Sequence, residues 1–493
     1  MAEIGHEQRT AVDWIDGERD TITAMNDQIW RFAEPGLREY RSSRALIQML
    51  REHGFDIEEG TGGMPTGFLA TWGEGKPVLG FFAEYDGTPG NSQWNVPYRS
   101  PISPYHCGFP DLHNGIGTAS VAGVIGLKMA MEKHELPGTI RLFGTPAEKL
   151  CVGKPFQSLY GAYDGLDAVI AWHPRAYSTL EWDSGPGCYQ STVYDFHGTS
   201  TYAAAPWAGT SALDAATLMN VIVQYQREHI PREFMATVNE LVSVGGLHPT
   251  ALPEFAQVWY VMRSPSTEGI EYVQSMLTRA AEAATHALGA TFGERMVASA
   301  RPWLPNHVMA RHCYRNLERV GGPRFGDTEI AFAREVVANA GIEAMDPPLD
   351  TELTPPESGI TAEFAGGADD VTEFCYHAPT ARIYIAYGLR AQGKIPNWCN
   401  AAFAATGVAH ETVLAAARAI ATSAVDLILS PETLDEAWRE FHERTGGKPM
   451  PVRLPAGAEP PVDLTIPPYY PAGWQPPGGV DDIPSSHLHP RTE

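Results

Sequence analysis

The sequence predicts an α/β fold: a larger domain with a mixed, mostly parallel sheet flanked by helices, interrupted by a small α+β domain. Between residues 67 and 172, short apolar strands alternate with helical stretches, as in a buried parallel sheet covered by helices. After Cys188 the order becomes strand, helix, strand, strand, helix, which is typical of a separate α+β unit. We therefore divide the chain into a larger domain (1–188 and 301–435), an inserted domain (189–300) and a proline-rich C-terminal extension (436–493).

The elements of the larger domain follow from hydrophobic periodicity. Apolar residues recur at helical spacing between Thr21 and Gly54, and Pro35-Gly36 divides this stretch into two helices. Runs of β-branched and aromatic residues bounded by turn residues predict strands, and longer apolar stretches predict helices. Strands are expected at 67–72, 77–83, 138–143 and 168–172, and helices at 117–131 and 155–163.

The same patterns continue to the end of the chain. In the inserted domain, strands are expected at 192–196, 241–245 and 257–262, and helices at 211–227 and 270–288. The alanine-rich stretch 401–429 closes the larger domain. The tail from Pro449 to Pro490 holds 12 of the 40 prolines, which lack a backbone N–H donor and prevent a regular helix or central strand. We expect either an extended arm or a mobile segment there.

Composition excludes several classes of partner. The 493 residues carry 59 acidic and 35 basic side chains, a net charge of −24 that repels nucleic acid and anionic membrane surfaces. The six cysteines form no CxxC pair, so we expect reduced thiols rather than a disulfide scaffold or a zinc ribbon. The acidic N-terminus is unlike a signal peptide, and no apolar run reaches the roughly 18 residues that cross a bilayer. The sequence predicts a soluble, cytoplasmic protein whose partner is a small molecule.

Polar side chains gather where predicted strands end, which is where open α/β sheets place their sites. Each group alone is weak evidence, because most acidic loop residues are solvated or cap helices. An isolated histidine likewise makes a structural hydrogen bond more often than a metal bond. The four groups are Glu84-Tyr85-Asp86, Asp111-Leu112-His113, Glu148-Lys149 and His173.

The motifs around these groups follow one another in a recognisable order between Asp20 and Ser430. They are 83–90 (AEYDGTPG), 113–119 (HNGIGTA), 144–148 (GTPAE), 171–174 (AWHP), 196–198 (FHG) and 211–215 (SALDA). Together they resemble the aminobenzoyl-glutamate hydrolase branch of the aminoacylase-type metallopeptidases, to which the indole-acetyl-amino-acid hydrolases are related. The resemblance implies a metal-dependent hydrolase of C–N bonds, with a catalytic domain and an inserted lid domain through which two copies form a homodimer.

The chain departs from the resembled pattern at the first metal ligands. The family has Cys-Gly-His-Asn, in which the thiolate bridges two metal ions. Here the aligned segment is Asp111-Leu112-His113-Asn114, so Asp111 replaces the thiolate. An alternative alignment uses Cys107-Gly108 and needs an insertion of three residues before His113.

Further departures affect the other expected site residues. The family's Glu-Glu pair, a base followed by a ligand, becomes Glu148-Lys149. The family's last histidine ligand, expected just before a tryptophan, aligns with Pro396 or Asn397, which precede Trp398. In the lid, a histidine that stabilises the oxyanion falls on Tyr202.

These losses concentrate on one of the two metal positions that the resemblance implies. That position uses the bridging residue, the second glutamate and the last histidine, and two of these three are lost. The other set survives as Asp111, His113 and His173. Two imidazoles and one carboxylate are a facial triad for a single divalent metal, so we expect one Zn²⁺ or Mn²⁺ per chain and loss of the second site. Lys149 either supplies positive charge at the empty position or points to solvent.

The resemblance also implies a mechanism. A divalent ion lowers the pKa of its bound water toward ~7. Glu148 is expected to take the water proton and pass it to the leaving nitrogen. Asp86 is expected to contact His113 or Glu148 and to fix the orientation of that side chain. Tyr202 either donates a hydrogen bond to the charge that develops on the substrate or is a packed aromatic residue of the lid.

The substrate is expected to be a small aromatic or N-acyl amino acid. Arg263 on a lid strand either clamps a carboxylate or pairs structurally, and Asn397 is a further candidate for substrate binding. Hydrolytic deamination of an activated amino-aromatic acid is an alternative reaction, because it needs the same activated water and base. A second alternative is a catalytically inactive homologue that binds a ligand. Retention of Glu148 beside one complete ligand set argues against it.

Overall fold

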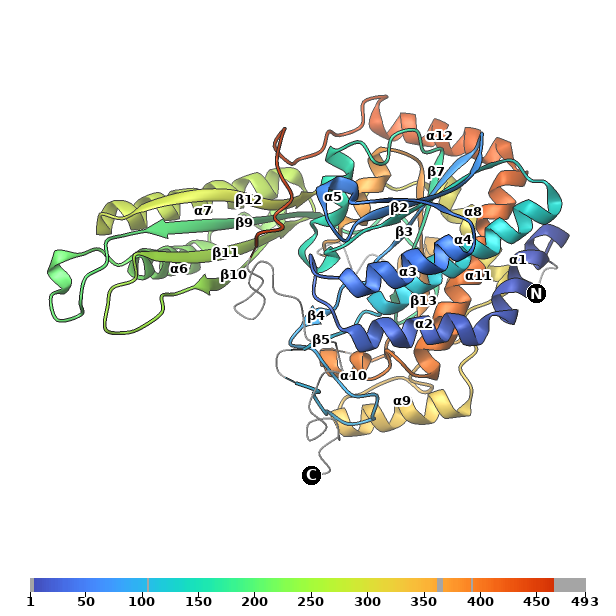
Figure 1. Ribbon diagram of the computed structural model, residues 1–493, viewed down its shortest axis with the longest axis horizontal. Helices are drawn as coiled ribbons and strands as arrows, with labels where there is room; N and C mark the ends of the chain where they lie inside the picture. The colour runs from blue at the N-terminus through green and yellow to red at the C-terminus, as the bar shows by residue number, and fades with distance from the viewer. Residues whose placement is uncertain (1–3, 104–105, 361–366, 392, 465–493) are drawn as a thin grey trace.

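The computed structural model describes residues 4–103, 106–360, 367–391 and 393–464. The chain forms two bodies, each built on its own sheet, which together make an elongated molecule (Figure 1). It leaves the larger body after β8 (Thr179–Leu180) and re-enters it before α8 (His307–Val320). The smaller body therefore interrupts the larger one.

The sheet of the larger body has seven strands in the order β1-β2-β6-β3-β7-β13-β8. Its four central strands are parallel neighbours: β6 (Gly138–Gly144), β3 (Val78–Ala83), β7 (Ala168–Arg175) and β13 (Thr380–Ala386). The outer strands β1 (Asp56–Glu59), β2 (Phe68–Glu74) and β8 pair antiparallel. The predicted mixed sheet is confirmed, and its parallel strands bring their carboxyl ends to one edge.

Helices cover this sheet with broad apolar faces. α4 (His113–His134) and α11 (Gly407–Leu429) are buried along most of their lengths and belong to the same core. α11 is long and apolar enough to cross a membrane by length and composition, but 83% of that window is buried inside the fold. The remaining helices of this body are α1 (His6–Gly17), α2 (Arg19–Phe32), α3 (Tyr40–Glu52), α5 (Gly153–Leu159), α8, α9 (Asp327–Ala340), α10 (Asn397–Ala401) and α12 (Pro431–Thr445).

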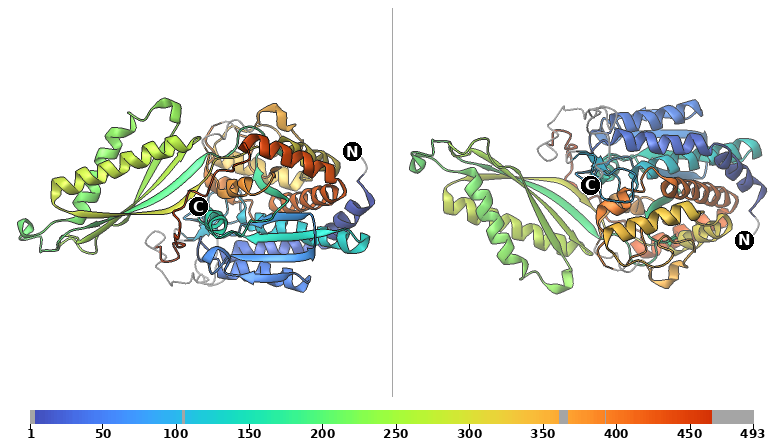
Figure 2. Two further views of the ribbon diagram at one scale, coloured as in Figure 1. Left: turned by 90° about the horizontal axis from the view of Figure 1, so that it is seen from above. Right: turned by 90° about the horizontal axis from the view of Figure 1, so that it is seen from below.

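The smaller body is a four-stranded antiparallel sheet in the order β10-β11-β9-β12. Its strands are β9 (Cys188–His197), β10 (Thr237–Val244), β11 (Phe255–Ser264) and β12 (Thr291–Ala300). The helices α6 (Ala212–Arg227) and α7 (Thr267–Leu288) pack on this sheet (Figure 2), with a hydrophobic core separate from that of the larger body. The boundaries at residues 188, 300 and 435 stay predictions.

Several elements lie outside the sequence prediction, among them α8, α9 and β13 of the larger body, and also β12 and α1. β12 begins with exposed polar side chains and is buried only over its last four residues, so periodicity does not reveal it. α1 comes from an acidic N-terminal stretch and buries one face of Gln8, Ala11, Val12 and Ile15. The cysteines are buried, and among the described residues they form no disulfide.

The described part of the proline-rich tail runs across the junction of the two bodies. Over residues 449–464 it contains neither helix nor strand, as predicted, and the rest of the tail lies outside the described residues. Leu464 is buried in a cluster with Ala147 of the larger body and Val297 of the smaller one. Arg38 donates to the carbonyl oxygen of Leu464 at 3.4 Å. The described part of the tail is therefore an arm that ties the two bodies together.

Candidate metal centre

The predicted site groups meet at the carboxyl edge of the central strands. Glu84 and Asp86 follow β3, and Glu148 comes after β6. His173 lies near the end of β7, and His113 opens α4. A small two-stranded sheet of β4 (Thr88–Pro89) and β5 (Cys107–Gly108) closes the loop that brings the chain back to His113.

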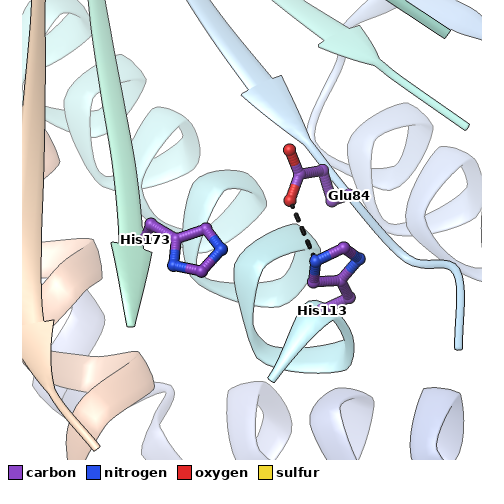
Figure 3. A group of neighbouring side chains, drawn as sticks. All are labelled: Glu84, His113 and His173. Carbon is purple, nitrogen blue, oxygen red and sulfur yellow. Dashed lines mark ion pairs between the residues drawn. The ribbon is translucent and has the colours of Figure 1, made fainter. Parts of the chain in front are cut away.

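Glu84, His113 and His173 form a buried group of ligand-type side chains (Figure 3). They each present one ligand atom within 4.8 Å of the others, and all three residues are buried. Glu84 Oε2 lies 3.4 Å from His113 Nε2. The Nδ1 atoms are used elsewhere, since His113 Nδ1 contacts Asp86 at 2.8 Å and His173 Nδ1 contacts the carbonyl of Pro174 at 2.8 Å. Each ring therefore leaves Nε2 available as a ligand.

The donor atoms of this group fit a divalent cation. Glu84 Oε2 and His113 Nε2 are buried without a hydrogen-bond partner, which is costly unless a ligand satisfies them. Burial lowers the pKa of His173 well below its usual value, so its imidazole is neutral, the form that binds metals. Two imidazoles and a carboxylate are the donor set of a single divalent transition metal with open positions.

Asp111, His113 and Glu148 form a second group with ligand atoms within 4.8 Å of one another. Here an ammonium already pairs with both carboxylates: Lys149 Nζ lies 2.5 Å from Asp111 Oδ2 and 2.5 Å from Glu148 Oε2. Burial opposes protonation of His113, but the Asp111 and Glu84 carboxylates outweigh it and raise the His113 pKa to about 10. Lys149 is the counter-ion of Asp111 and Glu148 in this group.

A third group, Glu84, Asp369 and Asp370, lies on the other side of Glu84. Lys154 Nζ lies 2.7 Å from Glu84 Oε1 and also pairs with Asp370. Asp369 pairs with Arg382, a fully buried residue of β13. Burial raises the pKa of Asp370 well above its usual value, and Lys154 opposes this only in part.

Six carboxyl groups and three permanent cations meet in this buried cluster. Its charge also depends on two shifted groups, because the pKa of His113 is raised to about 10 and the pKa of Asp370 is raised well above its usual value. His113 therefore carries a proton at neutral pH, and a divalent cation that binds its Nε2 would displace that proton. The carboxyl groups belong to Glu84, Asp86, Asp111, Glu148, Asp369 and Asp370, and the cations are Lys149, Lys154 and Arg382.

Two buried carboxylates hold the loop that carries Glu148. Glu39 accepts a hydrogen bond from the N–H of Ala147 at 2.7 Å, and Asp86 accepts one from the N–H of Lys149 at 2.9 Å. Ala147 has φ 56° and ψ 42°, a left-handed conformation that is uncommon for a residue with a Cβ. The two bonds therefore stabilise a strained turn on either side of Glu148. Asp86 also contacts His113, so one carboxylate links the ligand to the loop.

Three predicted site residues lie apart from this cluster. Tyr202 is 76% exposed in a loop of the smaller body, and Arg263 is exposed on β11. Asn397 opens α10 and donates to Asn91 at 3.0 Å. In the described ranges, none of the three contacts the carboxylates or imidazoles above. Cys107 lies in β5 and belongs to none of the ligand groups found among those residues.

Sequence reasoning gave no role to three central side chains, Glu84, Lys154 and Asp370. The sequence does carry a signal for Glu84, because residues two apart in an extended chain face the same side and Asp86 is a predicted site residue. Lys154 gave no such signal, because its partner Asp370 is 216 residues away in the sequence. Local patterns do not reveal a contact of that kind.

No protein-family model matches this chain. Among curated proteins, it is similar to one of the subunits of p-aminobenzoyl-glutamate hydrolase from Escherichia coli (strain K12), with 28% identity over 477 residues, covering 91% of this chain and 97% of the relative. Xaa-Arg dipeptidase of Mus musculus is 25% identical over 459 residues, covering 89% and 93%. Both matches therefore include the larger and the smaller body.

A solved structure supports the fold. The aminobenzoyl-glutamate utilization protein from Klebsiella pneumoniae has a TM-score of 0.54 at 17% identity, covering 82% of this chain and 97% of that one. The sequence matches confirm the resemblance that the motifs predicted, since the chain is similar to a subunit of p-aminobenzoyl-glutamate hydrolase, and the solved structure shares its fold.

Proposed function

We propose that the protein is a metal-dependent hydrolase that cleaves a C–N bond in a small N-acyl or aminobenzoyl amino acid. One observation supports this most directly: unsatisfied ligand atoms of Glu84 and His113 lie beside His173, and Glu148 is 3.3 Å from the same His113 nitrogen. A metal site and a carboxylate base are therefore adjacent. The relatives named above are a hydrolase and a dipeptidase, which supports the same class of reaction.

Each residue of the cluster has a role in this proposal. Glu84, His113 and His173 would hold one zinc or manganese ion, which lowers the pKa of a bound water to about 7. Asp111 keeps one buried oxygen, Oδ1, without a hydrogen bond and available to the same ion. Glu148 takes the proton of the attacking water and delivers it to the leaving nitrogen. Asp86 orients His113 through Nδ1.

A single ion per chain follows from the two lysines. Lys149 pairs with Asp111 and Glu148, and Lys154 pairs with Glu84 and Asp370. Each ammonium supplies positive charge where a further cation would otherwise bind. The group of Glu84 Oε2, His113 and His173 is the one that remains open to a metal.

We further propose that two chains pair through the smaller body. β10 is an edge strand on which Leu241 and Val242 are 41% and 43% exposed, and α6 next to it exposes Tyr225 to 73%. An uncovered edge with apolar side chains is a pairing surface, and a twofold copy of the same edge would cover it. Light scattering after gel filtration should give a particle of two 53.7 kDa chains. A mass of one chain would contradict this.

The first test of the metal site is the metal content of the purified protein by plasma mass spectrometry. We expect one zinc or manganese ion per chain, lost in Glu84→Gln and in His173→Ala. His229→Ala, which removes a histidine side chain 74% exposed on the smaller body, is the matched control and should keep the ion. Two ions per chain would contradict the single-ion proposal, and none would favour an inactive ligand-binding homologue.

The second test is turnover by the metal-loaded protein. We expect cleavage of p-aminobenzoyl-glutamate or N-acetyl amino acids, followed by release of the amine product. Ammonia released from amino-aromatic acids, with no amide cleaved, would instead support the deaminase alternative. Binding of these compounds without any product would support the inactive homologue.

A further inference from the structure

A pocket of about 430 Å³ lies between the loop after β4 and the start of α10. One wall comes from residues 90–101 and the other from residues 396–398. A hydrogen bond from Asn397 to Asn91 at 3.0 Å joins the two walls. This pocket is separate from the carboxylate cluster, and the proposed mechanism gives it no role.

The side chains that line the pocket favour a negatively charged ligand. It has no carboxylate, although the chain carries 59 acidic residues and a net charge of −24. It contains one cation, Arg99, which is exposed and makes no ion pair in the part of the chain that the structure describes. The amides of Asn91 and Asn397 and the hydroxyl of Ser92 supply further polar groups. A guanidinium without a partner, flanked by amides, is suited to bind a carboxylate.

The pocket also offers an aromatic surface. Trp398 is half-buried in its wall. An indole face stacks on another ring or packs against an apolar side chain of a ligand. A ligand with a carboxylate and an aromatic or apolar group would therefore satisfy both Arg99 and Trp398.

The pocket adjoins the segment that carries Asp111 and His113. The carbonyl of Asn91 packs directly on Gly108, since a Cβ placed on that glycine would lie 1.8 Å from the Asn91 oxygen. Gly108 is three residues before Asp111, so their Cα atoms are at most about 11 Å apart. Tyr387 donates to the carbonyl of Asn400 at 2.6 Å and lies 3.5 Å from that of Phe109, which ties α10 to the same segment. Both walls of the pocket are therefore tied to the segment that leads to Asp111 and His113.

We infer that this pocket binds the carboxylate-bearing end of the substrate, with Arg99 as the anion-binding residue and Trp398 as the packing surface. The inference rests on the proposed function and narrows its substrate class to acids with an aromatic or apolar group next to the carboxylate. Asn397 contributes here by holding the two walls together.

The test is calorimetric titration of the purified, metal-loaded protein with benzoate, an aromatic carboxylate with no bond to cleave. We expect Arg99→Gln to weaken benzoate binding at least tenfold and Trp398→Ala to weaken it severalfold, with unchanged metal content. Arg324→Gln, at another exposed arginine, is the matched control and should bind benzoate like the wild type. Benzamide, the neutral analogue, should bind weakly to all of them. Equal benzoate affinity in the wild type and Arg99→Gln would overturn the inference.

Turnover separates this inference from the proposed function. With a substrate that is hydrolysed, Arg99→Gln should raise KM about tenfold and leave kcat within twofold. Benzoate binding that depends on Arg99, in a protein that hydrolyses no amide, would contradict the proposed function and support the pocket assignment. Hydrolysis with an unchanged KM in Arg99→Gln would support the proposed function and contradict the pocket assignment.

Discussion

Lys149 and Lys154 are near neighbours in the chain and each pairs with two carboxylates, but their surroundings differ. Lys154, Glu84 and Asp370 have no exposed side-chain surface. Lys149 is 21% exposed, and its partner Asp111 is 31% exposed. The first ion cluster is closed and the second opens toward solvent.

This difference separates a structural ion cluster from one that is accessible to a ligand. Breaking a fully buried ion pair leaves charge that water cannot reach, so Lys154 must stay in place. The open pair of Lys149 with Asp111 and Glu148 is partly solvated, and a substrate or a second cation can compete for it. The reacting groups are therefore expected on the open side, at Glu148, and the fixed support on the closed side.

The largest expected effect is at Glu148 in the open cluster. Glu148→Gln keeps the shape of the side chain and removes its basicity, so we expect kcat to fall by about 10²–10⁴. Metal content should be unchanged, because Glu148 is not one of the three proposed ligands. Activity is measured with whichever substrate the turnover screen identifies. Full activity in this variant would remove Glu148 from the role of base.

The next effect is at Lys154 in the closed cluster. Lys154→Met leaves Glu84 and Asp370 buried without their counter-ion, and we expect the free energy of unfolding to fall by about 3–5 kcal/mol. Urea denaturation followed by circular dichroism measures it. Lys149→Met is the matched variant and should cost less free energy of unfolding, because Lys149 and its partner Asp111 are partly exposed. Equal losses in the two variants would contradict the distinction between closed and open clusters.

A third change converts the open cluster into a metal site. Lys149→Glu removes the ammonium and adds a carboxylate beside Asp111, His113 and Glu148, whose ligand atoms already lie within 4.8 Å. We expect the metal content to rise from one divalent ion per chain to two. Lys149→Met, which frees the carboxylates without adding charge, should bind the second ion more weakly. A content that stays at one would show that Lys149 is not what excludes it.

The smallest effect concerns Glu39, which accepts a hydrogen bond from the N–H of Ala147 and so holds the loop of the open cluster. Burial, together with the nearby Asp86 carboxylate, raises the pKa of Glu39 from 4.5 to about 8. Between these values the folded chain keeps a proton that the unfolded chain has released, so this group makes the protein less stable as pH rises. Glu39→Gln cannot titrate, and we expect a flatter pH dependence of the unfolding free energy over this window. The same slope in both proteins would show that Glu39 is ionised throughout.

The two clusters also show how far sequence reasoning reaches. Asp86, Glu148 and His173 could be selected because they follow apolar runs that predict strands, and His113 because it precedes a predicted apolar helix. Lys149 could be selected because it stands next to Glu148 in the chain. The closed cluster could not be predicted, since Lys154 meets Asp370 only through the tertiary fold. Whether Tyr202 and Arg263 act on the substrate stays a prediction.

The fold was predictable to a similar extent and for similar reasons. β3, β7 and α4 are apolar over most of their length, so hydrophobic runs in the sequence predict these buried elements. β12 has six exposed or half-exposed residues at its start, and its pairing with β9 depends on a partner about a hundred residues earlier. Pairing of this kind is set by tertiary structure rather than by local pattern.

The position of β13 in the large sheet has a consequence for how the chain is made. β13 lies between β7 and β8, yet Thr380–Ala386 leaves the ribosome long after both of them and after the whole of the smaller sheet. Until then β7, an apolar strand of the future sheet centre, has an unpaired edge in the nascent chain. The smaller body, which is contiguous from β9 to β12, can fold first. Synthesis therefore passes through a stage with one finished body and one exposed strand edge, the kind of surface that chaperones bind and that aggregates in their absence.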